Sequence, residues 1–290
     1  MGPTLVAGVV AGGIYGLLAV GIVLVYKGSR VLNFAQGELG TFALFVAWWF
    51  IDRNDFPWVA GAVLGVGASV AIALSFERLV VRRMVDASRL SVAVATVGLF
   101  LFLIALEAFV FSEALVVLGP PISGLGPKVF DFYVGPTSIL SLVAVVAIAF
   151  GLAAFLRRTD FGLGVLAASQ DPTMVRLVGV RLSRVSAFTW ALAGGLGAVA
   201  ALLIEPTIGV FAPGFMTQFF IRGLAAALLG GLTSLPGAFV GGLGVGLVEA
   251  FVGRAFVQSG VPGVRTMTVF ALLVIVLLVR PAGLLGKTAR

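Results

Sequence analysis

The sequence predicts an all-α protein that crosses a membrane many times. Of its 290 residues, 60% are hydrophobic and only 11% are charged, whereas about a quarter of the residues are charged in a typical soluble domain. Apolar runs of the length that crosses a bilayer as a helix, about 20 residues, recur from one end to the other. Because so few charged residues cannot cover a surface that faces water, a soluble enzyme is excluded.

Nine hydrophobic segments are the candidate membrane spans, and they cover residues 4–26, 31–51, 56–76, 90–111, 134–156, 185–204, 217–233, 237–252 and 266–280. The glycine-rich pair within 217–252 forms either a full hairpin or a re-entrant segment, and both return the chain to the same side. We therefore expect about eight to nine transmembrane helices in a single transmembrane domain, residues 1–290.

The positions of the basic residues predict the orientation. With the N-terminus outside, most of the 19 lysines and arginines fall on the cytoplasmic side, as the positive-inside rule requires. The same arrangement places the C-terminus in the cytoplasm. A few cations, including Arg53 and Arg222, face outward in this interpretation.

The longest cytoplasmic connection, about residues 157–184, contains a short predicted helix. Asp171 is a good helix cap, Pro172 suits the first turn, and Gly179 suits the end. Met174, Leu177 and Val178 would form an apolar patch on this helix. Such a segment either docks into a groove of a separate protein or is an ordinary capped loop.

Polar residues interrupt the beginning of the span at 31–51. Asn33, Gln36 and Glu38 lie in its inner half, and an ionised carboxylate at membrane depth costs about 2.5–3.5 kcal/mol. Gly37 and Gly40 permit either close helix contact or a local break. These residues therefore line a pathway, or they form a buried hydrogen-bond network that only fixes helix packing.

Paired glycines mark the segment from residue 229 to 242. The residues that set it apart are Gly230, Gly231, Ser234, Pro236, Gly237, Gly241 and Gly242. Because this composition does not support one stiff helix, we expect a tight reversal between closely packed segments. It lies near a translocation route, or its glycines serve packing alone.

Several kinds of chemistry are excluded by composition. The chain has no cysteine and no histidine, which removes disulfides, Cys/His metal sites and imidazole acid–base catalysis. Gly286-Lys287-Thr288 looks like the end of a phosphate-binding loop, but the first glycine of that motif is replaced by Pro281. We expect no metal, no catalytic residue and no cofactor on this chain, and no nucleic-acid partner.

Four stretches together resemble one family. They are YGLLAVGIVLVYKGSRVLNFAQGELG (15–40), ASQDPTMVRLVGV (168–180), LLGGLTSLPGAFVGGLGVGLVEA (228–250) and VRPAGLLG (279–286). They are similar, in this order and over nearly the whole chain, to the inner-membrane permeases of branched-chain amino acid ABC importers, most closely to the LivH-type subunit.

The resemblance implies a non-catalytic permease in the plasma (inner) membrane of a bacterium or archaeon. Its partners would be a second permease, homologous or identical, two ATP-binding cassette subunits that use the ATP, and an extracytoplasmic solute-binding protein. The implied translocation pathway for branched-chain or similar small amino acids includes Asn33, Phe34, Gln36, Gly37, Glu38 and Thr41. The implied contact with the ATPase includes Asp171, Pro172, Thr173, Met174, Arg176, Leu177 and Gly179.

Other transport functions stay open from the sequence. An ABC permease for urea, amides or sugars would have a similar composition, and so would a channel. A self-sufficient secondary transporter could use Glu38, Glu107 or Glu249 to couple an ion gradient.

Overall fold

The computed structural model describes residues 1–111, 115–122, 124, 126–129, 132–177, 179–256, 263–280 and 283–286. This part of the chain is largely helical. Its α-helices are α1 (Gly2–Ser29), α2 (Gln36–Arg53), α3 (Trp58–Leu79), α4 (Arg89–Phe111), α5 (Pro136–Arg158), α6 (Asp160–Gln170), α7 (Pro172–Leu177), α8 (Leu182–Ile208), α9 (Thr217–Gly230), α10 (Leu235–Ala255) and α11 (Val264–Val279). A 3-10 turn, η1 (Val81–Met84), follows α3, and β1 (Lys128–Val129) pairs antiparallel with β2 (Phe132–Tyr133).

Every predicted span contains a helix, so the prediction of a polytopic, mainly helical membrane protein is confirmed. Among the described residues, 6 helices are long and apolar enough to cross a membrane: α1, α3 with η1, α4, α5, α8 and α10. The other spans correspond to the shorter helices α2, α9 and α11. The sequence did not predict α6 or the β1–β2 pair.

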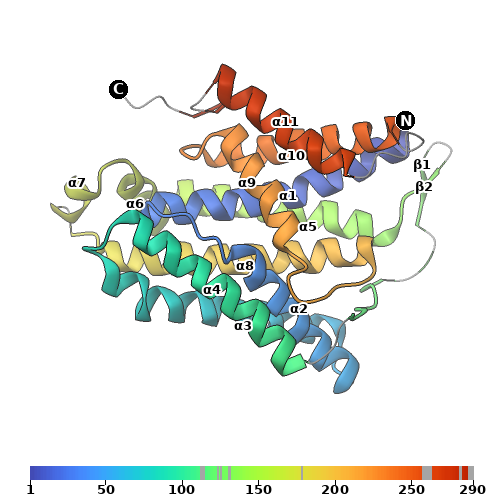
Figure 1. Ribbon diagram of the computed structural model, residues 1–290, viewed down its shortest axis with the longest axis horizontal. Coiled ribbons are helices and arrows are strands. Elements are labelled where there is room, and N and C mark those ends of the chain that lie inside the picture. Colours follow the sequence, from blue (N-terminus) through green and yellow to red (C-terminus); the bar gives the residue numbers. More distant parts are fainter. Residues whose placement is uncertain are drawn as a thin grey trace.

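The helix α1 lies at the centre of the bundle. Within its most apolar stretch 89% of the residues are buried, against 17% in α5. It contacts α10, α9, α5 and α8, and α8 in turn contacts α2 and α3 (Figure 1). The remaining long helices surround these two central ones.

The two ends of the bundle differ. In Figure 1, α6 and α7 lie at one end, and the N-terminus and the β1–β2 pair lie at the other. Because α1 runs from one end to the other, the connection that contains α7 and the N-terminus are separated by the whole length of the bundle.

Backbone-to-backbone packing joins α1 to α10. Glycines spaced four residues apart place one face of α1 against α10, and the facing positions are Gly8, Gly12 and Gly16 on α1, and Gly242, Gly246 and Ala250 on α10. A Cβ atom at Gly12 would lie 2.8 Å from the Cα atom of Leu243. Small residues permit this close approach in membranes, where packing and not hydrophobic burial holds helices together.

The chain reverses tightly between α9 and α10, as the glycine pairs lead one to expect. The α9 helix ends at Gly230, and Gly231 continues with φ +97°. The side chain of Ser234 then caps α10 by accepting a hydrogen bond from the Gly237 backbone N–H at 3.1 Å. Pro236 occupies the first turn of α10, where its missing N–H is not needed.

The close contact between α1 and α10 can be tested with a matched pair of glycines on α10. Gly246→Ala places a methyl group against the Gly12 backbone, whereas Gly244→Ala points into open space. Overpacking of this kind costs about 1–3 kcal/mol. We expect the melting temperature of the detergent-solubilised protein to fall in Gly246→Ala and to stay unchanged in Gly244→Ala. Equal melting temperatures for the two variants would contradict the close contact.

Candidate functional site

The predicted span at 31–51 is wrong at its beginning, because residues 30–35 are not helical. The α1 helix ends at Ser29, and Arg30 follows in the left-handed region with φ 58°. Asn33 then stabilises a turn, since its Oδ1 atom accepts a hydrogen bond from the Ala35 N–H at 3.1 Å. Helix α2 begins only at Gln36.

This non-helical segment returns into the bundle. The side-chain Nε2 of Gln36 donates to the carbonyl oxygen of Leu18 at 3.1 Å, and Leu18 lies about 17 Å along α1 from Ser29 at 1.5 Å per residue. Residues 30–35 can cover about 20 Å when extended, so they suffice for this return. Helix α2 therefore starts beside the middle of α1.

The connection between α8 and α9 makes a similar return from the opposite end. Helix α8 ends at Ile208, and Gly209 and Gly214 both adopt φ +82° in the segment 209–216. The backbone N–H of Met216 donates to the Thr41 hydroxyl of α2 at 3.0 Å. Helix α9 therefore begins next to the first turns of α2, inside the bundle.

Glycines allow these elements to approach closely. A Cβ atom at Gly37 would lie 3.1 Å from the Met216 carbonyl oxygen, and one at Gly40 would lie 2.6 Å from the Gly197 carbonyl oxygen on α8. Of the two roles predicted for Gly37 and Gly40, close helix contact is the one that the structure contains, because the break lies before Gly37.

Two carboxylates meet the segment that leads into α9. The Thr217 hydroxyl donates to Glu38 Oε1 at 2.6 Å, and the Gly214 N–H donates to Glu107 Oε2 of α4 at 3.4 Å. Both glutamates have 0% exposed surface. One polar side chain of α2 and one of α4 thus bind the start of α9 and the segment that leads into it.

Most residues of the predicted pathway lie where the start of α2 meets the segment that leads into α9. Four of them are polar side chains with 0% exposure: Asn33, Gln36, Glu38 and Thr41. Phe34 is partly buried and packs edge-on against Phe220 of α9, with 6.2 Å between the ring centroids. The sequence interpretation did not include Gly214 or Thr217, for which it contained no signal, and it named Glu107 only as a candidate for ion coupling.

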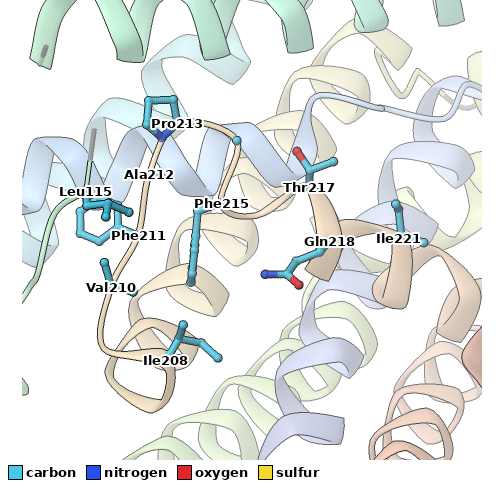
Figure 2. A pocket seen from close by; sticks show the side chains of 11 residues that line it. Leu115, Ile208, Val210, Phe211, Ala212, Pro213, Phe215, Thr217, Gln218 and Ile221 are labelled. Carbon is cyan, nitrogen blue, oxygen red and sulfur yellow. The ribbon is translucent and has the colours of Figure 1, made fainter. Parts of the chain in front are cut away.

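A hollow of about 420 Å³ borders the start of α9. Its lining is mostly apolar and includes Ile208, Val210, Phe211, Phe215 and Ile221, together with Gly214, Thr217 and Gln218. In Figure 2, the Gln218 side chain extends toward Phe215, while Thr217 points away from it. The hollow and the two buried carboxylates therefore share the wall formed by residues 214–217.

A second polar cluster connects α1, α9 and α10. The Arg222 guanidinium forms a salt bridge with Glu249 at 3.0 Å, and the Tyr15 hydroxyl donates to the same carboxylate at 3.0 Å. Arg222 also lies over the ring of Phe219, 5.4 Å from its centroid. Arg222 is therefore paired within the bundle, where a lone charge would be costly.

The short helix predicted in the connection 157–184 is present as α7. Asp171 caps it by accepting a hydrogen bond from the Met174 N–H at 3.0 Å, and Gly179 follows with φ +84°. Met174 and Leu177 are exposed, at 63% and 79%. The side chains of Pro172, Thr173 and Arg176, and Val178 as a whole, lie outside the described residues.

One arginine links this connection to the non-helical segment at 30–35. The Arg30 Nη2 atom donates to the carbonyl oxygen of Ser169 at 2.8 Å. Ser169 lies in the last turn of α6, immediately before α7. The end of α6, just before α7, is therefore in direct contact with Arg30, the residue that follows α1.

Comparison with known proteins shows the family of this chain. Residues 4–279 match the family described as "Branched-chain amino acid transport system / permease component". The chain is 30% identical over 295 residues to the high-affinity branched-chain amino acid transport system permease protein BraD of Pseudomonas aeruginosa, covering 98% of this chain and 95% of BraD.

Two further relatives give the same result. Identity to the permease protein LivH of Escherichia coli K12 is 32% over 302 residues, covering 97% of this chain and 94% of LivH. Identity to a probable LivH of Methanocaldococcus jannaschii is 27% over 243 residues, covering 81% and 76%. The chain therefore belongs to the family of branched-chain amino acid ABC transport permeases, as a non-catalytic, multi-pass membrane subunit.

Proposed function

We propose that the translocation pathway of this permease runs past the place where α2 and α9 begin. The observation that carries the proposal is that two helices start inside the bundle, next to buried polar side chains. Interrupted backbone at membrane depth is tolerated where it is enclosed by protein or lines a cavity, and transporters use such interruptions to bind solutes. The pathway residues are Asn33, Phe34, Gln36, Gly37, Glu38 and Thr41.

The solute in this proposal is a branched-chain or similar small amino acid. The relatives BraD and LivH are branched-chain amino acid permeases, which supports this solute class. A zwitterion with an aliphatic side chain needs a few polar groups beside an apolar surface. The start of α2 and the hollow beside α9 combine these two properties.

The orientation in this proposal has the N-terminus outside and the C-terminus in the cytoplasm, with eight to nine crossings. The distribution of basic residues supports it, and so does the separation of α7 from the N-terminus in Figure 1. A homologous or identical second permease completes the pathway, and an extracytoplasmic binding protein delivers the solute to its outer side.

The energy source is a pair of ATP-binding cassette subunits, one of which contacts α7. This chain itself binds no cofactor. Two properties support α7 as the contact: its exposed apolar side chains, Met174 and Leu177, and its defined start at Asp171. A short helix with an apolar face is a common element for docking into a groove. The contact residues are Asp171, Pro172, Thr173, Met174, Arg176, Leu177 and Gly179.

Arg30 transmits movement of α7 to the pathway in this scheme. Its bond to Ser169 ties the end of α6 to the segment that leads into α2. Displacement of α7 therefore pulls on residues 30–35, which are not held in a helix. The closure of the ATPases would bias the permease between two conformations through this route.

The orientation can be tested by cysteine labelling, because the chain contains no cysteine. Single variants Met174→Cys and Tyr133→Cys place a thiol on exposed side chains at the two ends of the bundle. In intact cells, we expect an impermeant maleimide to label Tyr133→Cys and to leave Met174→Cys unlabelled until the membrane is opened. Labelling of Met174→Cys from outside would refute the orientation and the ATPase contact together.

The contact at α7 can be tested through its cap. Asp171→Ala removes the acceptor for the Met174 N–H, whereas Asp171→Asn retains one. Loss of a cap costs about 0.5–2 kcal/mol, so we expect ATPase subunits to co-purify with the alanine variant at least about twofold less well. The asparagine variant should co-purify normally. Equal co-purification and equal ATP hydrolysis in both variants would remove this role.

The link through Arg30 predicts loss of coupling without loss of assembly. Arg30→Ala breaks the bond to Ser169, and Arg184→Ala, at an exposed arginine of the same end, is the control. In proteoliposomes with the complete complex, we expect fewer amino acids transported per ATP hydrolysed in Arg30→Ala only. A normal ratio in Arg30→Ala would show that movement reaches the pathway by another route.

A further inference from the structure

Two acidic side chains from other helices bind the segment that leads into α9, one at residue 214 and the other at residue 217. Gly214 N–H and the Thr217 hydroxyl bind Glu107 and Glu38, so the two carboxylates converge from α4 and α2 on residues 214–217. Each carboxylate uses only one oxygen for these bonds. Both side chains have 0% exposed surface, so water outside the bundle does not reach them.

The second oxygen of each carboxylate has no partner. Glu38 Oε2 and Glu107 Oε1 are buried and form no hydrogen bond within the described part of the chain. Neither glutamate forms one of the salt bridges found there. Buried polar atoms are rarely left unpaired, so these two oxygens lack hydrogen-bond donors. Because a buried carboxylate is costly unless its charge is paired, a positively charged donor suits them best.

The surroundings favour an organic ammonium group over a bare ion. The N–H groups of Met216 and Thr217 at the start of α9 donate to Thr41 and to the Gly214 carbonyl oxygen. The N–H groups that follow give this start a partial positive charge, which suits a carboxylate. Residues 214 and 217 also form part of the wall of the apolar hollow next to α9. One short stretch of chain thus borders two buried carboxylates, the start of a helix and an apolar hollow.

We infer that Glu38 and Glu107 together bind the α-ammonium group of the transported amino acid, while the start of α9 faces its carboxylate and the hollow receives its aliphatic side chain. This inference rests on the proposed function, and it adds a ligand group and a second binding residue on α4. An ammonium group carries three N–H donors, enough for both unpaired oxygens.

The first test uses amide substitutions in the complete complex in proteoliposomes. Glu38→Gln and Glu107→Gln remove the negative charge with little change of shape, and we expect each to lower amino acid uptake at least about tenfold. Glu205→Gln is the matched control, because Glu205 is equally buried with one unpaired oxygen but binds Leu118 instead. Its uptake should stay within about twofold of the unchanged protein.

ATP hydrolysis separates this inference from the function on which it rests. Stimulation of hydrolysis by the loaded binding protein should persist in the control Glu205→Gln, which leaves both the ATPase contact at α7 and the ammonium site intact. Absence of stimulation in the unchanged complex would instead count against the proposed function. Normal uptake in both Glu38→Gln and Glu107→Gln would overturn the ammonium site.

A chemical test identifies the group that binds. A carbodiimide that modifies buried carboxyl groups is applied to the unchanged complex, and labelling of Glu38, Glu107 and Glu205 is measured by mass spectrometry. We expect leucine and 3-methylbutylammonium to protect Glu38 and Glu107, and 4-methylpentanoate, which lacks the ammonium group, to protect neither. Protection by sodium ions alone, or none by leucine, would overturn the inference. Labelling of Glu205 should not change.

Discussion

The structure depends on one constraint: inside a membrane, each backbone N–H and C=O group needs a partner supplied by the protein. Unbroken helices meet this requirement by themselves. The starts of α2 and α9 do not, and they rely instead on side chains for these hydrogen bonds. Asn33, Thr41 and Thr96 each bind a backbone N–H in or beside these two returning segments. The polar residues of the apolar bundle are therefore part of its architecture as well as of its chemistry.

Much of the fold follows from the sequence because the apolar runs are long and the caps are local. Every predicted span contains a helix, and Asp171 and Ser234 cap the helices that they precede. The start of α2 was misplaced for a physical reason. Residues 31–35 include apolar side chains that suit a span, whereas their non-helical path is set by a distant partner, Leu18, which is bound through Gln36.

At the candidate site, too, local features could be predicted from the sequence, whereas contacts between distant residues could not. Glu38 is visible in the sequence, since a lone carboxylate in an apolar span is costly. Its partner Thr217 is separated from it by most of the chain, and no local pattern marks that threonine. The pairing of Arg222 with Glu249, to which Tyr15 also donates, was likewise not predicted from the sequence. Contacts between residues far apart in the sequence can be identified only once the fold is known, however clear the local sequence patterns are.

The glycine contact between α1 and α10 has a mechanical consequence. Where the two backbones touch, few side chains lie between them, and the Arg222–Glu249–Tyr15 cluster fastens α9 to the same pair. We therefore expect these three helices to move together. Any alternation between inward-open and outward-open shapes must then be absorbed at hinges, and the uncoiled segments 30–35 and 209–216 are where the chain can bend at the least cost in helical hydrogen bonds.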